Sequence, residues 1–257
     1  FKNGQILLIE TGYFGCLRFR STVKETGKHV IIAECNITPY TCRKIGPNKL
    51  YIDGKREKIY VAALPSTDTP RVLDLVKNVY PGMTASQNVL QTSLDGAGNF
   101  LLHAPVALLH RGLMERTKKF ELPAKEAFPK SVIKLGEIME EERMRLGKAF
   151  GLKLTPLKDT WEMEGDTFEE TLRRSKEYQT YIMEYNNCMN PYLTEDLYYA
   201  LPPLSSLASL VKVPTPTIDA IIHIFSIIDG VDSLKEGTNV EKMGRTRLTT
   251  KEILRLL

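Results

Sequence analysis

An asparagine and a histidine four residues apart are the first side chains in this sequence that suggest chemistry. Asn99 and His103 lie in an apolar stretch, Gly96 to Gly112, that also contains Pro105 and His110. On a helical backbone, residues four apart project from one face, so the amide and the imidazole would together face a polar group of a substrate. Imidazole is the side chain most often used for acid–base catalysis near neutral pH.

The same residues have a plainer interpretation. His103 lies between Leu102 and Ala104, and a histidine in apolar surroundings is commonly a core residue with one satisfied hydrogen bond. Pro105 lacks an N–H and crowds the carbonyl four residues back, so it must begin a helix or kink one. GAGNFL imitates a dinucleotide-binding loop, but Leu101 occupies the place of the third glycine and no apolar strand precedes it. We therefore exclude a phosphate loop here.

The composition indicates a globular protein that does not bind nucleic acid. The 257 residues are 42% hydrophobic, and 35 basic against 31 acidic residues leave a net charge of only +4. The four cysteines show no CxxC pair and no zinc spacing, which favours free thiols, a cytoplasmic location and no metal site. The best apolar run, Ala220 to Ile228, is too short for a membrane span. Because Phe1 is not an initiator methionine, we expect the sequence to begin inside a longer protein.

The N-terminal part of the chain is typical of an α/β fold. Two short apolar runs, Gln5 to Glu10 and His29 to Glu34, have the character of buried parallel strands. Between them, Gly12 and Gly15 indicate a turn and Tyr13 to Glu25 can be helical. Together these segments predict a β-α-β unit.

A hairpin is predicted after this unit. Lys49 to Leu64 contains two apolar runs separated by Asp53-Gly54, a strong turn signal. Glu34 ends the second buried strand, at the edge of an open α/β sheet where ligands gather. A salt bridge at the strand end explains Glu34 equally well.

Beyond residue 66 the pattern becomes helical. The segment PSTDTP at residues 65–70 supplies prolines and helix caps, so we place a domain boundary there and assign residues 67–257 to an all-α domain. An α/β part followed by a helical part suggests a nucleotide-dependent enzyme with its site at the junction.

Two long helices are predicted in the all-α domain. Glu126 to Phe150 is expected to form one helix, with Pro129 in its first turn. Phe168 to Asn187 is expected to form another, capped by Asp166 or Thr167.

Four segments, taken together, resemble the octopine/nopaline dehydrogenase family, the opine dehydrogenases. In the family's order and about its spacing, they are AECNITPYTCR (Ala33 to Arg43), Asn99 with His103, YLTEDLYYALPPLSSLA (Tyr192 to Ala208) and VPTPTIDAII (Val213 to Ile222). The resemblance implies the C-terminal part of a Rossmann-type dinucleotide-binding domain, followed by a helical domain like that of 6-phosphogluconate dehydrogenase. It also implies that NAD(P)H reduces the imine of an amino acid and a 2-oxo acid to an opine.

The resemblance implies an acid–base pair. His103 takes the place of the catalytic histidine, and Asp196 takes that of the carboxylate that orients it. A plainer explanation of Asp196 is a carboxylate in the first turn of a helix capped by Thr194. Asp219, which also opens a helix, is the rival partner of His103.

Other site residues follow from the same resemblance. Substrate binding is implied for Asn99, Cys35 and Tyr40, and cofactor binding for Gly12 and Glu34. Each has a simpler alternative: helix capping for Asn99, loop packing for Cys35 and Tyr40, backbone freedom for Gly12 and a salt bridge for Glu34.

The implied chemistry predicts how the site is built. His103 and Asp196 should share a cleft that faces the end of the Gln5 to Glu10 strand. An opine carries two carboxylates, so a cation such as Arg43 or Arg111 should lie beside His103, although a surface ion pair is the favoured interpretation of Arg111.

The sequence departs from the family pattern at three points. Cys35 and Ala104 stand where the family commonly has threonine and proline, which leaves the substrate preference and the local helix geometry open. The GxGxxG fingerprint occurs nowhere in the 257 residues, so we expect the first half of the nucleotide domain to be missing and the chain alone to bind NADH weakly. The choice between NAD and NADP, the two substrates and the formation of a homodimer stay open.

Two other functions are consistent with the sequence. One is a different NAD(P)-dependent reductase on the same two-domain plan, such as a hydroxy-acid or ketopantoate-type enzyme. The other is a non-catalytic helical dimerisation module, in which apolar faces rather than buried polar pairs would dominate. The distance between His103 and Asp196 distinguishes the dimerisation module from the opine dehydrogenase.

Overall fold

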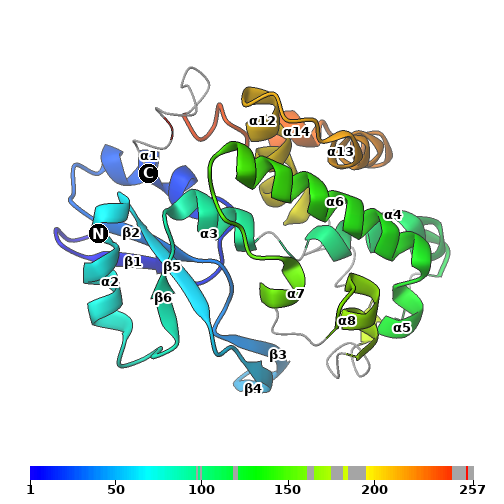
Figure 1. The fold of residues 1–257 in the computed structure, drawn as a ribbon, viewed down its shortest axis with the longest axis horizontal. Coiled ribbons are helices and arrows are strands. Elements are labelled where there is room, and N and C mark those ends of the chain that lie inside the picture. The colour runs from blue at the N-terminus through cyan, green and yellow to red at the C-terminus, as the bar shows by residue number, and fades with distance from the viewer. Residues whose placement is uncertain are drawn as a thin grey trace. The chain divides into compact units, whose positions relative to one another are not determined.

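The computed structural model describes residues 1–96, 98, 100–117, 121–160, 165–174, 182–184, 195–244 and 253. They fall into two compact units, one built on Phe1–Gly96 and the other on Ala97–Thr250, and Ile253 belongs to the first. The first unit is a sheet with helices on both faces and the second is mostly helical, so the predicted order of α/β followed by all-α is confirmed (Figure 1). Among the described residues, no helix is long and apolar enough to cross a bilayer.

The first unit is organised on a four-stranded sheet with the order β1-β2-β5-β6. Strands β1 (Ile6–Ile9) and β2 (Ile31–Cys35) are parallel and are connected by helix α1 (Gly15–Glu25). Strand β5 (Ile59–Leu64) runs antiparallel to β2 and parallel to β6 (Met83–Ala85). The predicted β-α-β unit is therefore confirmed and forms one side of a mixed sheet.

Helices cover both faces of the central strand β2. Its odd-numbered residues join an apolar cluster with β6 and with α2 (Thr69–Val76), which follows the 3₁₀ turn η1 (Ser66–Asp68). Glu34 points to the opposite face, where it contacts α1 and α3 (Val89–Gly96). Alternation along a strand sends successive side chains to opposite faces, so burial on both sides accounts for the continuous apolar run.

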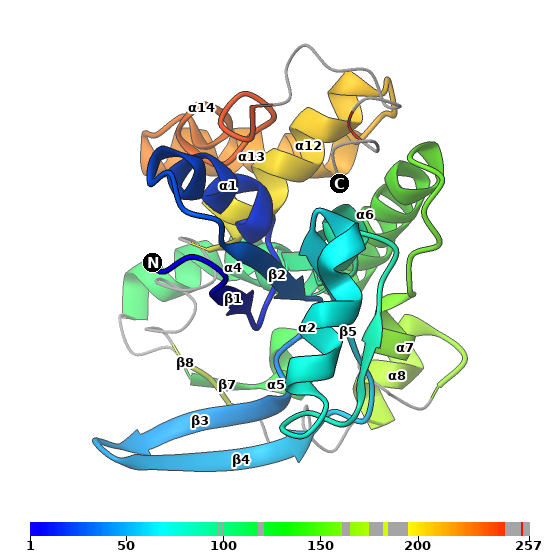
Figure 2. The same cartoon turned by 90° about the vertical axis from the view of Figure 1, so that its left-hand side faces the viewer.

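The hairpin predicted over Lys49 to Leu64 is wrong. Strand β4 (Lys49–Lys55) pairs with β3 (Tyr40–Gly46) in a separate two-stranded ribbon, and β5 joins the main sheet instead (Figure 2). Gly54 lies inside β4 opposite Thr41, beside an irregularity in the register. The Asp-Gly signal is local and carries no information about the partner strand, and the turn of the real hairpin lies between β3 and β4.

The first unit extends beyond the proline-rich segment at residues 65–70. Residues 67–96 belong to it, because α2 packs on β5 and β6 pairs with β5 from Ile59 to Val61. Pro65 directly follows β5 and Pro70 lies in the first turn of α2, and the chain then returns to the same sheet before the helical unit begins.

The second unit is built around α4 (Phe100–Thr117) and α6 (Lys130–Ala149), which lie side by side (Figure 1). Helix α4 passes through Pro105, which cannot donate to the carbonyl of Leu101 one turn earlier. Gly136 of α6 approaches that carbonyl so closely that an added Cβ would lie 2.7 Å from the oxygen. Pro105 therefore does not begin the helix, and a glycine allows the neighbouring helix to come close.

The long helix predicted over Glu126 to Phe150 is divided at Pro129. A short helix, α5 (Ala124–Ala127), precedes this proline, and α6 begins immediately after it. Pro129 has extended dihedral angles, with φ −65° and ψ 165°, and it occupies the N-cap position of α6. A proline is well placed at a helix start but does not continue the helix before it.

The helix predicted over Phe168 to Asn187 is also too long. Helix α8 (Phe168–Arg174) begins as expected, and Thr167 caps it by accepting the N–H of Glu170 at 3.2 Å. Further along, β8 (Ile182–Glu184) forms an antiparallel pair with β7 (Glu121–Pro123). The polar, aromatic-rich segment after α8 thus contains a strand that its helical periodicity did not indicate.

The remaining elements of the second unit are α7 (Leu157–Thr160), the π-helical turn η2 (Asp196–Ala200), α12 (Leu201–Leu210), α13 (Pro216–Asp229) and α14 (Ser233–Glu236). The start of α13 is anchored by Glu142 of α6, a fully buried carboxylate that accepts the N–H groups of Thr217 at 2.9 Å and Ile218 at 3.0 Å. A carboxylate at the N-terminus of a helix also interacts favourably with the positive end of the helix dipole. Charge as well as packing therefore holds α6 and α13 together.

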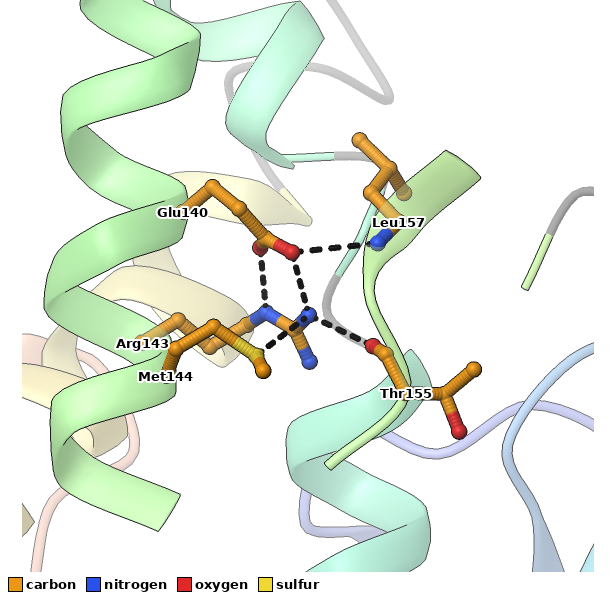
Figure 3. Close-up of polar contacts among 5 residues, drawn as sticks. All are labelled: Glu140, Arg143, Met144, Thr155 and Leu157. Carbon is orange, nitrogen blue, oxygen red and sulfur yellow. Dashed lines mark hydrogen bonds and ion pairs between the residues drawn. The ribbon is translucent and has the colours of Figure 1, made fainter. Parts of the chain in front are cut away.

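A buried arginine fixes the segment that follows α6. Arg143 donates to the two carboxylate oxygens of Glu140 at 2.7 and 2.8 Å and to the carbonyl of Thr155 at 2.8 Å (Figure 3). Glu140 also accepts the N–H of Leu157 at 3.0 Å. The bidentate pair therefore ties the chain beyond α6 back onto that helix.

Candidate active site

His103 and Asp196 meet in the second unit although 93 residues separate them in the sequence. The Nδ1 atom of His103, on α4, lies 3.2 Å from Oδ2 of Asp196, on η2. The Asp196 side chain is 2% exposed and that of His103 is 20% exposed. The imidazole is therefore open to solvent on one side, while the carboxylate behind it is not.

The contact determines how the imidazole is protonated. An ionised carboxylate only accepts hydrogen bonds, so Nδ1 of His103 is the donor. In the neutral ring the basic lone pair is then on Nε2. Burial raises the pKa of the Asp196 carboxyl, and the hydrogen bond and charge of His103 oppose that rise. The arrangement suits a histidine that takes up and releases a proton while a buried carboxylate stabilises its charged form.

Asp196 occupies an uncommon backbone conformation. It opens the π-helical turn η2, in which the N–H of Leu201 donates to the carbonyl of Asp196, five residues back. Two prolines, Pro202 and Pro203, follow at the start of α12 and cannot donate to the preceding carbonyls. Single π turns inside helices are rare and occur frequently at functional sites.

The rival carboxylate, Asp219, has different partners. It accepts hydrogen bonds from Ser205 Oγ at 2.6 Å and from Thr215 Oγ1 at 3.2 and 3.3 Å. These contacts join the first turn of α13 to α12. Of the two aspartates that the sequence suggests, Asp196 is the one in contact with His103.

Glu34 is buried at the centre of a hydrogen-bond network in the first unit. Its carboxylate accepts the N–H of Cys16 at 2.9 Å, the hydroxyl of Thr92 at 3.0 Å and that of Ser93. Burial raises the pKa of the carboxyl, and these hydrogen bonds lower it. Glu34 thus ties β2 to α1 and α3, and in this structure its carboxylate is occupied by the protein itself.

Gly12, beside this network, allows the turn before α1 to approach α3 closely. A Cβ at Gly12 would lie 3.1 Å from the Cα of Ser93 and 3.2 Å from the carbonyl oxygen of Thr92. The next two residues, Tyr13 and Phe14, have left-handed φ values of 60° and 62°. This turn is therefore packed tightly against α3.

Cys35 lies on the opposite face of the sheet from Glu34. It is fully buried in the apolar cluster under α2, and burial followed by the charges of Glu10 and Glu34 raises the pKa of its thiol to about 12. A substrate could reach this side chain only by displacing core residues. Tyr40, by contrast, is 37% exposed at the start of β3.

Other side chains of the histidine stretch have local partners. His110 contacts the carbonyl of Val106 at 3.0 Å through Nδ1. Arg111 pairs with Glu115 at 2.8 Å and with Asp229 at 2.9 Å, which agrees with its interpretation as an ion-pair residue. Other predicted residues lie outside what the structure describes: Asn99 and Thr194 entirely, and Arg43 in its side chain.

The second unit also contains a cavity away from His103 and Asp196. A cavity of about 860 Å³ lies among α12, α13 and α14, and Ser205, Asp219 and His223 are among the residues that line it. Neither His103 nor Asp196 lines this cavity. Within the described ranges, no group of three or more His, Cys, Asp or Glu residues could hold a metal ion.

Sequence reasoning missed the residues that support these side chains. The hydroxyls of Thr92 and Ser93 on α3 carry no motif, and only the resulting fold brings them to Glu34. The proline pair after η2 is visible in the sequence, and it was a signal that the helix start there is irregular.

Comparison with known proteins gives one consistent result. Residues 85–228 match the family model described as NAD/NADP octopine/nopaline dehydrogenase, alpha-helical domain. The chain is 31% identical over 258 residues to an opine dehydrogenase of Arthrobacter sp. (strain 1C), a match that covers 98% of this chain and 71% of that protein.

Solved structures show the same fold. An octopine dehydrogenase with NADH and pyruvate matches with a TM-score of 0.69 and 15% identity, over 97% of this chain and 70% of its own. A yersinopine dehydrogenase with bound NADP⁺ matches with a TM-score of 0.61 and 13% identity, over 96% of this chain and 72% of its own.

Proposed function

The chain belongs to the NAD/NADP octopine/nopaline dehydrogenase family, and from this we propose that it reduces the imine of an amino acid and a 2-oxo acid to an opine. The resemblance found in four sequence segments is thus confirmed, and the protein is an NAD(P)-dependent oxidoreductase. The proposed reaction of an amino acid with a 2-oxo acid rests on one observation, the hydrogen bond between the partly exposed His103 and the buried Asp196.

The reaction requires protons to move at several points. An amine must lose a proton before it attacks the carbonyl of the oxo acid, and the carbinolamine must gain one at its hydroxyl before water leaves. His103, with Nδ1 directed to Asp196, can perform both transfers through Nε2. Asp196 is proposed to keep the ring in this tautomer and to stabilise the imidazolium between the two transfers.

Gly12 and Glu34, the two residues implied to bind the cofactor, both contact other parts of the first unit. The hydride chemistry belongs to the nicotinamide, but neither residue implied to bind it offers an open contact in this structure. The carboxylate of Glu34 is engaged by Cys16, Thr92 and Ser93, and the space at Gly12 is filled by α3.

A relative of similar fold and the proton transfers of imine formation indicate the substrate class. The octopine dehydrogenase similar in fold was solved with pyruvate, which is a 2-oxo acid. A partly exposed histidine beside a carboxylate suits an oxo acid and an amine donor, because carbonyl addition and dehydration, the two steps of imine formation, each require a proton transfer.

A substrate matrix tests the proposed reaction. Several 2-oxo acids are crossed with several amino acids, and the loss of NADH or NADPH absorbance is measured with the intact enzyme. We expect oxidation of the cofactor only when both an oxo acid and an amine are present, because the imine must form before hydride arrives. Equal rates with an oxo acid alone would identify a hydroxy-acid or ketopantoate-type reductase and would contradict the proposal.

A further inference from the structure

The backbone of the π turn is held by a segment distant in sequence. Pro202 has no N–H, so it cannot donate to the carbonyl of Tyr198 as a residue at that position of a helix would. That carbonyl accepts the N–H of Thr238 at 2.6 Å. Thr238 follows α14 and is 2% exposed, so the contact is sealed from water.

Gly237 makes this contact possible. A Cβ at Gly237 would lie 2.8 Å from Cγ of Pro202 and 2.7 Å from the carbonyl oxygen of Tyr198. Its φ of −70° is ordinary for any residue, so the glycine is required by close approach and not by its backbone conformation. The loop after α14 is therefore fitted to the turn that carries Asp196.

A regular α-helix at this point would move Asp196. An α-helix advances about 100° per residue, and a π turn contains one more residue than an α turn, so regularisation would rotate the residues before it by about that angle. The Asp196 side chain would then turn away from His103. A proline at position 202 and a competing donor at position 238 both oppose that change.

We infer that Pro202 and Thr238 are positioning residues, which hold the π turn so that Asp196 meets His103. Both act on Asp196 through the backbone of the π turn, because Pro202 lacks a donor for the Tyr198 carbonyl and Thr238 supplies one. The effect on turnover rests on the proposed acid–base function, whereas the effect on the His103–Asp196 contact does not.

The first test is Pro202→Ala, with Pro216→Ala as the matched control. Both prolines lie in the first turn of a helix of the second unit, but Pro202 directly follows the π turn in α12, whereas Pro216 begins α13. The readout is the ¹⁵N resonances of the His103 ring nitrogens in selectively labelled full-length enzyme, which report the tautomer and the hydrogen bond at Nδ1. We expect Pro202→Ala to shift them and Pro216→Ala to leave them unchanged. Unchanged His103 resonances in Pro202→Ala would overturn the inference.

The second test removes the donor and keeps Pro202. Thr238→Pro deletes the N–H that binds the Tyr198 carbonyl, while Thr238→Ala removes the side chain and retains the N–H. Because Gly237 is already extended, with ψ of 179°, a following proline can be accommodated. Thr238→Pro should shift the His103 resonances, and Thr238→Ala should leave them unchanged. Identical spectra for the two variants would contradict the role of the backbone contact.

Turnover separates this inference from the proposed function. When the contact is lost, kcat should fall on the order of 10²-fold, with KM for the cofactor unchanged, because a misplaced catalytic group loses orientation. Shifted resonances with normal kcat would support the positioning role and refute acid–base catalysis by His103. Normal resonances with reduced kcat would refute the positioning role alone.

Discussion

Two helical glycines in the second unit should respond to alanine in opposite directions. Gly136 of α6 faces the carbonyl of Leu101, whose oxygen would lie 2.7 Å from a new Cβ, whereas nothing lies within 4 Å of a Cβ at Gly112 of α4. Both changes bring the same gain in helix propensity, about 1 kcal/mol. The difference between the variants therefore measures the contact between α4 and α6.

The magnitude follows from the clash. Overpacking a tight contact costs about 1 to 3 kcal/mol, so Gly136→Ala should be destabilised by about 1 kcal/mol net. Gly112→Ala should be stabilised by up to about 1 kcal/mol because Gly112 is exposed. In a unit of this size the two midpoints should differ by several degrees, on the scale of about 2 to 4 °C per kcal/mol.

Thermal and urea unfolding, followed by circular dichroism at 222 nm, would measure both variants. The expected order of stability is Gly112→Ala, then wild type, then Gly136→Ala. If the two variants shift equally and in the same direction, α4 and α6 do not approach at Gly136, and the account of how Pro105 is accommodated fails.

Two further changes test the buried polar groups. Burial raises the folded-state pKa of Glu34 above its unfolded value of about 4.3. Between the two pKa values the folded protein keeps a proton that the unfolded chain has lost. The stability of the fold therefore falls as the pH rises through the folded-state pKa. Glu34→Gln cannot ionise and should lose less stability above about pH 4 in denaturant titrations; a pH profile parallel to that of wild type would contradict the buried carboxyl. Arg143→Lys loses the bidentate contact with Glu140 and should cost about 2 to 4 kcal/mol. The control is Arg145→Lys, because Arg145 forms an exposed ion pair with Glu141 at 3.7 Å, and it should cost less than about 0.5 kcal/mol. Equal losses of unfolding free energy in urea for the two variants would refute the structural role of Arg143.

Much of the fold was predictable because the signals are local. The runs Gln5 to Glu10 and His29 to Glu34 have the length and continuity of strands buried on both faces, and they form β1 and β2. His103 was considered on a helical backbone because of its spacing from Asn99, and it lies on α4. Its partner Asp196 came from the family resemblance, since no local rule connects residues that are 93 positions apart.

The remaining features depend on contacts between distant residues. The Asp-Gly pair of β4 is a valid turn signal that was overruled by pairing with β3. The partners of Glu34, Thr92 and Ser93, are 58 and 59 residues away, so no local pattern in the sequence indicated this hydrogen-bond network. The π turn could not be foreseen either, because it depends on the Thr238 N–H as well as on Pro202.

The central claim is that His103 performs acid–base catalysis and that Asp196 acts only through it. The most direct measurement is kcat for His103→Ala, Asp196→Asn and the double variant, with the best amine and oxo acid from the substrate matrix. His103→Ala should lower kcat by about 10²- to 10⁴-fold, and adding Asp196→Asn should lower it little further, because a residue that works through the histidine has nothing left to orient. Near-normal turnover of His103→Ala, or fully additive losses in the double variant, would contradict the account.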